Sequence, residues 1–219
     1  MKKIIVFGTG DIAQLANYYF KTDSDLEIVA FTVNQSYIKD SVFEGIPVIP
    51  FENIEHLFSP SEYEMFIALS YSKMNAIREI KYNEAKAKGY SLVSYISSKC
   101  TYLSNYPCGD NCFILEDNTI QPFVRIGNNV TLWSGNHIGH HSIIHDHNFL
   151  SSHVVVSGHC EIKSNCFMGV NSTLHNNITL KKGTLVGAGA IISKNTIENG
   201  VYIAPKSGIF KLNSGQIKF

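Results

Sequence analysis

Histidine is the residue type in this chain whose number and spacing point most clearly to chemistry. Eight of the nine histidines lie between residues 137 and 175, namely His137, His140, His141, His145, His147, His153, His159 and His175. An imidazole exchanges a proton near neutral pH and is also the commonest side-chain ligand of metals. The cluster is therefore open to three interpretations: a general base, a metal site, or exposed histidines without a chemical role.

The segment that carries these histidines repeats with a period of six residues. The residues in phase with this period are large and apolar without interruption: Ile114, Ile120, Ile126, Leu132, Ile138, Ile144, Leu150, Val156, Ile162, Met168, Leu174, Leu180, Val186 and Ile192. Helices repeat their faces near 3.6 residues and strands near 2, so neither accounts for six. The sequence therefore predicts a parallel β-helix of hexapeptide repeats, with three short sides and about eighteen residues in each turn.

The coil predicts which residue lies next to each histidine, because residues eighteen apart stack on successive turns. His141 then lies under His159, and His140 lies under Gly158. A glycine leaves room beside His140 and offers an unobstructed backbone N–H. A base next to such a donor suits acyl transfer, since the amide can hold the developing oxyanion. The spacing of His140 and His145 also occurs in β-helical zinc carbonic anhydrases, but a zinc site needs a third ligand.

The first hundred residues alternate between predicted strands and helices. Strands are expected at 3–7, 26–33, 65–69 and 90–96, and helices after the turn at Gly8–Gly10 and at 73–88. This order predicts a small Rossmann-like α/β domain with a parallel sheet. The candidate nucleotide-binding residues lie in the glycine turn or follow strands: Gly8, Gly10, Asp11, Asn34, Ser70, Tyr71 and Asn75. Alternatively, the glycines only make a tight turn.

The composition excludes several classes of protein. Lys plus Arg and Asp plus Glu both number 18, so no charge imbalance indicates binding to nucleic acid or to a membrane surface. The sequence shows no apolar run long enough for membrane insertion and no signal-peptide pattern. Five cysteines without a pairing pattern suit a reducing cytoplasm, so we expect a cytoplasmic protein. Cys112, Cys160 and Cys166 fall at small, inward positions of the coil.

The period also suggests where the domains divide. We expect a nucleotide-binding domain at residues 1–97 and the β-helix at residues 98–208. Residues 209–219 no longer follow the period and are predicted to form a tail that caps the open end of the coil. Trp133 and Phe149 are expected on an outer face of the coil, where a partner subunit would cover them.

Five stretches of the chain resemble one known family. They are residues 4–10, 85–90, 139–141, 151–158 and 186–190, of which the block from Gly139 to Gly158 is the most specific. The chain resembles the nucleotide-sugar acyltransferases of the left-handed β-helix superfamily. These include bacillosamine and perosamine N-acetyltransferases and sialic-acid O-acetyltransferase-like proteins. The resemblance covers almost the whole chain and implies a left-handed coil and a homotrimer.

The resemblance also implies roles for individual residues. His140 matches the catalytic histidine, and His141 stands where the family often has an acidic residue that orients it, so Asn136 or Asp146 are further candidates for that role. Gly158 matches the glycine whose amide faces the thioester oxygen. Residues that match or lie near the groove for coenzyme A are Gly169, Gly187, Ala188 and Lys206.

The function expected from these observations is the acetyl-CoA-dependent N-acetylation of a nucleotide-linked amino sugar (UDP, dTDP or GDP), with no metal. The mechanism would be direct attack in a ternary complex, because the block from Gly139 to Gly158 contains no cysteine nucleophile. The alternatives are a sugar O-acetyltransferase, a carbonic anhydrase-like zinc protein and a non-catalytic scaffold.

Overall fold

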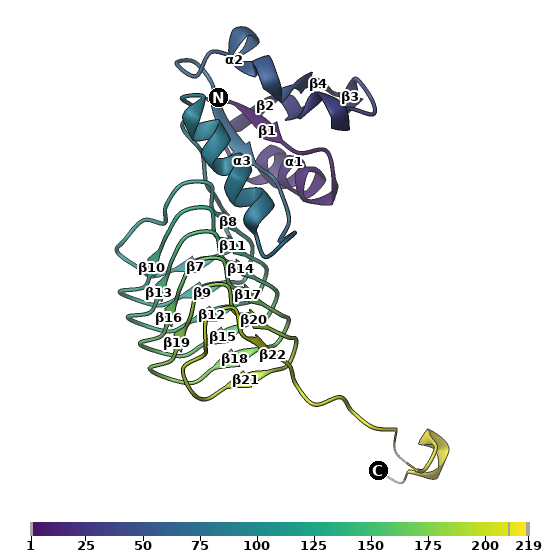
Figure 1. Ribbon diagram of the computed structural model, residues 1–219, viewed down its shortest axis with the longest axis vertical. Coiled ribbons are helices and arrows are strands. Elements are labelled where there is room, and N and C mark those ends of the chain that lie inside the picture. Colours follow the sequence, from purple (N-terminus) through teal and green to yellow (C-terminus); the bar gives the residue numbers. More distant parts are fainter. Residues whose placement is uncertain (1, 210, 218–219) are drawn as a thin grey trace.

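A small α/β part sits at one end of a long triangular coil in the computed structural model (Figure 1). The structure describes residues 2–209 and 211–217. Part of the predicted tail, at residues 210, 218 and 219, therefore lies outside the described residues, as does Met1 of the first predicted domain.

The α/β part contains a five-stranded sheet in the order β3-β4-β2-β1-β5. All neighbours are parallel except β3 and β4, which form an antiparallel hairpin that the sequence analysis did not predict. The strands are β1 (Lys2–Phe7), β2 (Leu26–Val33), β3 (Val42–Phe43), β4 (Ile46–Pro50) and β5 (Glu64–Ile67). The helical segments are α1 (Asp11–Asp23), η1 (Gln35–Tyr37), η2 (Phe51–Asn53), α2 (Ile54–Leu57) and α3 (Ala76–Ala87).

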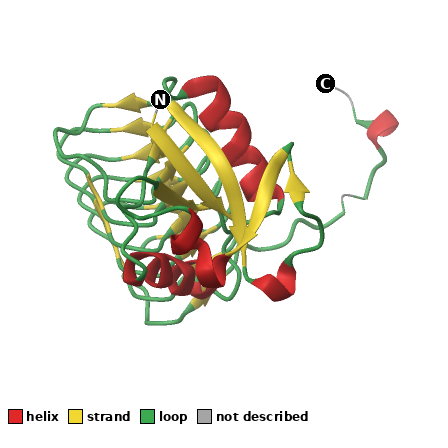
Figure 2. Cartoon of the chain, turned by 90° about the horizontal axis from the view of Figure 1, so that it is seen from above, coloured by secondary structure: helices red, strands yellow, loops and turns green. Residues whose placement is uncertain are grey.

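Two longer helices flank this sheet because each presents one apolar face to it. Helix α1 buries Ala13, Ala16 and Phe20 against the side chains of β1 and β2. Helix α3 buries Tyr82 and Ala85 on the other face. Figure 2 shows the sheet lying between these helices when the molecule is viewed from above. The predicted strand–turn–helix order is therefore confirmed for β1, α1 and β2.

The predicted strand at 90–96 divides into two parts. Leu92 makes only an isolated bridge to Met65 of the N-terminal sheet, whereas β6 (Tyr95–Ile96) pairs with the first turns of the coil. This part of the prediction was wrong because the chain passes from one sheet to the next within the apolar run.

Three parallel sheets form the sides of the coil. The seven-stranded sheet contains β6, β8 (Phe113–Ile114), β11 (Thr131–Leu132), β14 (Phe149–Leu150), β17 (Phe167–Met168), β20 (Leu185–Val186) and β22 (Val201–Tyr202). The six-stranded sheet contains β7 (Thr101–Tyr102), β9 (Thr119–Ile120), β12 (His137–Ile138), β15 (Val155–Val156), β18 (Thr173–Leu174) and β21 (Ile191–Ile192). The four-stranded sheet contains β10 (Arg125–Ile126), β13 (Ile143–Ile144), β16 (Glu161–Ile162) and β19 (Thr179–Leu180). A further short segment, η3 (Ser214–Gln216), follows the coil.

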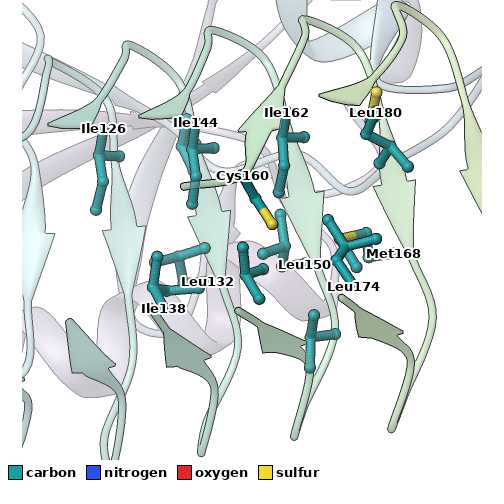
Figure 3. Close-up of a cluster of buried hydrophobic side chains, with 14 of the residues drawn as sticks. Ile126, Leu132, Ile138, Ile144, Leu150, Cys160, Ile162, Met168, Leu174 and Leu180 are labelled. Carbon is teal, nitrogen blue, oxygen red and sulfur yellow. The ribbon is translucent and has the colours of Figure 1, made fainter. Parts of the chain in front are cut away.

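The register of these sheets confirms the predicted turn of eighteen residues. Thr131 pairs with Phe149 and His137 pairs with Val155, so each strand stacks on the strand one turn later. Every residue of the six-residue apolar series is buried, with an exposure of 5% or less. Figure 3 shows these side chains stacked along the axis of the coil. The predicted inward cysteines are buried among them, and burial raises the pKa of the Cys166 thiol to about 11.

The N-terminal part covers an outer face of the coil, where a partner subunit had been expected. Phe149 is only 2% exposed, and the ring of Tyr71 packs on it with 4.9 Å between centroids. Trp133 packs against the core of the N-terminal part. The buried guanidinium of Arg78 donates to Asn75 Oδ1 and to the carbonyl oxygen of Asn148. The prediction of a partner subunit on Trp133 and Phe149 was therefore wrong, because the chain covers this face itself.

The segment after β22 leaves the body of the protein instead of covering the end of its own coil (Figures 1 and 2). Ile203 is 75% exposed and Ile209 is fully exposed. Within the described residues, the predicted cap is thus not formed by the chain on itself. None of the helices in residues 2–209 and 211–217 has the length and apolar character needed to span a bilayer.

Candidate active site

His140 lies at the corner between the six-stranded and four-stranded sheets, two residues after β12. Its ring is exposed and faces outward, away from the apolar axis. The ring packs on the backbone of Gly158, one turn later. A Cβ atom at Gly158 would lie 2.8 Å from Nε2 of His140, so any other residue here would displace the imidazole from this position. The predicted pairing of His140 with Gly158 is present in the structure.

Two further imidazoles contact His140. Its Nδ1 lies 3.1 Å from Nδ1 of His141, and its ring meets the ring of His159 edge-on with 5.1 Å between centroids. His141 and His159 stack at 4.8 Å, as residues eighteen apart should. Only one hydrogen can lie between the two Nδ1 atoms, so one ring donates and the other accepts. His141 is thus placed to orient His140.

The predicted orienting role of Asn136 is wrong. Asn136 is 1% exposed, and both ends of its carboxamide hold turns of the coil. Its Nδ2 donates to the carbonyl of Trp133 at 2.6 Å, and its Oδ1 accepts from the amide of Val154 at 2.7 Å. The other candidate, Asp146, accepts from the amide of Asn128 at another corner.

The amide of Gly158 is not free in this conformation, contrary to expectation. It donates to Oδ1 of Asn176, 2.9 Å away on the next turn. Asn176 was not among the predicted site residues, although its position eighteen residues after Gly158 places it directly over that glycine. Because Asn176 is exposed, its carboxamide can rotate away without leaving a buried cavity.

The pair of histidines that had suggested a carbonic anhydrase is not brought together within the chain. His145 Nε2 contacts the Glu161 carboxylate at 2.8 Å, beyond the four-stranded sheet from His140. His147 is buried beside α3, where its Nδ1 contacts Asn129 Nδ2 at 2.9 Å. Burial lowers the pKa of His147. His145 and His147 therefore make structural contacts.

The glycine turn and the end of β5 form a surface pocket at the N-terminus of α1. Its lining includes Gly10, Asp11, Ser70 and Ser72. Gly8 has a φ of +130°, and a Cβ there would meet the Ala68 carbonyl oxygen at 2.6 Å. Gly10 caps α1 without a side-chain hydrogen bond, so no capping side chain occupies the first amides of the helix, as an anion site requires.

Three other predicted nucleotide contacts lie outside this pocket. Tyr71 packs on the coil, and the side chain of Asn75 is buried, with Nδ2 donating to the carbonyl of Cys166 at 3.0 Å. Asn34 donates to Oε1 of Glu52 at 3.0 Å, and the same carboxylate accepts from the Gln35 amide. Glu52 supplies a carboxylate near the end of β2, where the local sequence contains none. It is distant in sequence, so no local signal identifies it.

The residues predicted for coenzyme A lie at a different corner from His140. Gly169 and Gly187 follow strands of the seven-stranded sheet, with the six-stranded sheet between them and the corner of His140. A Cβ at Gly169 would lie 2.5 Å from the amide nitrogen of Ala188, so the backbones stack closely here. Ala188 and Lys206 are exposed. One chain alone does not bring these residues to His140.

Solved structures of three bacterial proteins share this fold. The acetyltransferase domain of PglB from Neisseria gonorrhoeae FA1090 matches with a TM-score of 0.79 at 21% identity, covering 93% of this chain and 97% of that one. WeeI from Acinetobacter baumannii AYE matches with a TM-score of 0.77 at 17% identity, covering 93% and 97%. PerB from Caulobacter crescentus, in complex with CoA and GDP-perosamine, matches with a TM-score of 0.69 at 18% identity, covering 93% and 95%.

The chain has the fold of these structures, a left-handed β-helix. The predicted resemblance is confirmed at this level, including the small α/β part that precedes the coil. Residues 1–89 match the family model described as C2185-like, N-terminal. None of the curated proteins matches the sequence.

Proposed function

We propose that this protein transfers the acetyl group of acetyl-CoA to the amino group of a nucleotide-linked amino sugar. The observation that carries the proposal is the exposed imidazole of His140, held over the backbone of Gly158 and contacted by His141. An acyl transfer to an amine needs a proton acceptor and an amide donor side by side, and this corner supplies both. A further PglB structure, in complex with acetyl coenzyme A, has the same fold.

His140 acts as the general base in this proposal. The sugar amine attacks the thioester carbonyl carbon, and Nε2 of His140 takes the proton that the nitrogen loses. For Nε2 to hold a free lone pair, the ring hydrogen must sit on Nδ1, where it is donated to Nδ1 of His141. The tetrahedral intermediate then collapses, the carbon–sulfur bond breaks, and the proton held on Nε2 of His140 passes to the sulfur, so that coenzyme A leaves as the thiol and His140 is neutral again.

Gly158 stabilises the oxyanion once Asn176 has moved. The thioester oxygen takes the place of Asn176 Oδ1 as acceptor of the Gly158 hydrogen. A covalent route through a thiol is not part of the proposal. The nearest cysteine in sequence, Cys160, points its sulfur inward to the His175 carbonyl, and burial raises its pKa, which keeps the thiol protonated.

The site is completed by a neighbouring subunit of a homotrimer. Within one chain, the corner of Gly169, Gly187 and Ala188 is separated from His140 by the six-stranded sheet. When the corner of Gly169, Gly187 and Ala188 in one protomer packs beside the His140 corner of the next, both corners lie along one groove for acetyl-CoA. Outward residues of the intervening sheet include Val155 and Ile191, which are 38% and 66% exposed and are apolar enough for such a contact.

The nucleotide is held by the N-terminal part. The pocket at the N-terminus of α1 suits a diphosphate, since amides and hydroxyls of Ser70 and Ser72 converge there. We infer UDP, dTDP or GDP as the carrier, and a cytoplasmic location, where acetyl-CoA is made and where the five free cysteines stay reduced.

An acceptor panel tests this function. Purified protein is incubated with acetyl-CoA and UDP-, dTDP- or GDP-linked sugars that carry either an amino or a hydroxyl group at the acceptor position. Thiol release and product mass are recorded. N-acetylation of an amino sugar is expected. Acetylation of hydroxyl acceptors alone would replace the proposal with O-acetyl transfer, and turnover of none of the sugars would overturn it.

A further inference from the structure

Three imidazoles cluster at the corner of His140, and the proposed proton transfer uses only two of them, His140 and His141. His140, His141 and His159 each present a ring nitrogen, and these three atoms lie within 4.8 Å of one another. All three side chains are exposed. Within the described residues, none of the three rings has a hydrogen bond to a carboxylate, and the one hydrogen bond between the rings, from Nδ1 to Nδ1 of His140 and His141, is what a bound ion would replace.

We propose that His140, His141 and His159 bind a divalent transition-metal ion such as Zn²⁺, and that this ion blocks acetyl transfer. The second half rests on the proposed function, whereas the first does not. The ion is an inhibitor in this proposal and takes no part in the transfer reaction.

The distances within the cluster suit such an ion. Two imidazole nitrogens bound to zinc at 2.0–2.1 Å with tetrahedral geometry are about 3.3 Å apart. The Nδ1 atoms of His140 and His141 are separated by 3.1 Å. The nitrogen of His159 must move closer to complete the set, which a side-chain rotation achieves because the ring is exposed. Water can reach the fourth position of the ion from the solvent.

The coil itself brings the rings together. His141 and His159 occupy equivalent corners one turn apart, with φ values of 59° and 57°, and their rings stack at 4.8 Å. The corresponding corner one turn later holds Asn177, with a φ of 61°. Asparagine and histidine are both common in this left-handed conformation, and here two histidines occupy the same corner in successive turns. Imidazole donors favour Zn²⁺, Cu²⁺ and Ni²⁺ over Mg²⁺ or Ca²⁺.

Binding of the ion removes the base. A neutral imidazole has a single lone pair, and its other ring nitrogen carries hydrogen. If Nδ1 of His140 donates its lone pair to the metal, the hydrogen resides on Nε2, next to Gly158. Nε2 then has no lone pair with which to take the proton of the sugar amine. Acetyl transfer should therefore stop when the metal is bound and resume when a chelator removes it.

The experiment compares the wild-type chain with His159→Asn and His153→Asn. Asparagine suits both positions, because His153 has a φ of 58° and is exposed like His159, but it lies at another corner. Protein is freed of metal with a chelator. Zn²⁺ binding is measured by calorimetry, and Co²⁺ binding by visible absorption, which reports imidazole ligation. Each variant's transfer rate with zinc is compared with its own zinc-free rate.

We expect one Zn²⁺ per chain in the wild-type protein and in His153→Asn, with loss of transfer on zinc addition. His159→Asn should bind the ion at least about tenfold more weakly and require correspondingly more zinc for inhibition. Equal zinc affinity of His159→Asn and wild type would overturn the proposed metal site. Bound zinc without inhibition would overturn the proposal that the ion blocks acetyl transfer. If zinc-free wild type transfers no acetyl group, the proposed function fails, while calorimetry still decides the metal site.

Discussion

The backbone amide of Gly158 donates its hydrogen to Oδ1 of Asn176, 2.9 Å away. This contact occupies the one donor that the proposed mechanism assigns to the oxyanion. The carboxamide of Asn176 thus stands where the thioester oxygen must arrive. Acetyl-CoA can use this donor only by displacing Asn176, and this displacement makes the binding of acetyl-CoA less favourable.

Replacing Asn176 by alanine should therefore improve the enzyme. A net hydrogen bond contributes about 0.5–1.5 kcal/mol, so freeing the amide should raise kcat/KM for acetyl-CoA by about two- to tenfold. Initial rates at varied acetyl-CoA measure this, with Asn177→Gly as the control, because Asn177 is exposed and has a φ of 61° that glycine accepts. A fall in kcat/KM for Asn176→Ala alone would show that Asn176 assists the reaction.

His141 should act through the orientation of His140. Aspartate and glycine both tolerate the φ of 59° at this position, but only aspartate can accept the Nδ1 hydrogen of His140. We expect His141→Asp to keep kcat within about threefold of wild type, and His141→Gly to lower kcat by about 10- to 100-fold with little change in KM.

Steady-state kinetics in the presence of a chelator separate these outcomes, since the chelator removes any effect of bound metal. An equal loss of kcat in both variants would mean that the imidazole of His141 has a role that a hydrogen-bond acceptor cannot replace.

His147 should make the stability of the protein depend on pH. Burial lowers its pKa below the ordinary value of 6.5, against the opposing effect of Glu79. Below that value, the unfolded chain binds more protons at this position than the folded chain does. The free energy of unfolding should therefore decrease as the pH falls from about 6.5.

His147→Asn should flatten this dependence, because asparagine does not titrate. It also continues the stacked positions of Asn111 and Asn129, which are joined by a hydrogen bond of 2.8 Å. Urea midpoints at about pH 7.5 and about pH 5.5 test this, with the exposed His175→Asn as control. If the urea midpoint of His147→Asn changes with pH as much as that of the wild type, other groups cause the pH dependence.

The coil could be predicted from the sequence because its signal is periodic. A single phase held from Ile114 to Ile192 determines which side chains face the axis, and their burial follows from the eighteen-residue register. The same register predicted that His140 lies on Gly158 and that His141 stacks on His159.

The sequence contains no comparable periodic signal for contacts between segments that are distant along the chain. Arg78 belongs to an amphipathic helix, and its complete burial against the seven-stranded sheet depends on how the N-terminal part docks. That docking also covers Phe149. Glu52 reaches Asn34 only through the fold of the sheet. Asn136 was misassigned because turn-forming asparagines of a coil and polar residues of a site look alike in sequence.

The most direct test of His140 as the general base is the rate of acetyl transfer by His140→Asn, measured with the best acceptor of the panel and with chelator present. We expect a fall in kcat of about 10²–10⁴-fold, with an unchanged unfolding midpoint and oligomeric size. A variant that folds as wild type does and turns over within about threefold of it would contradict the assignment of His140 as the base.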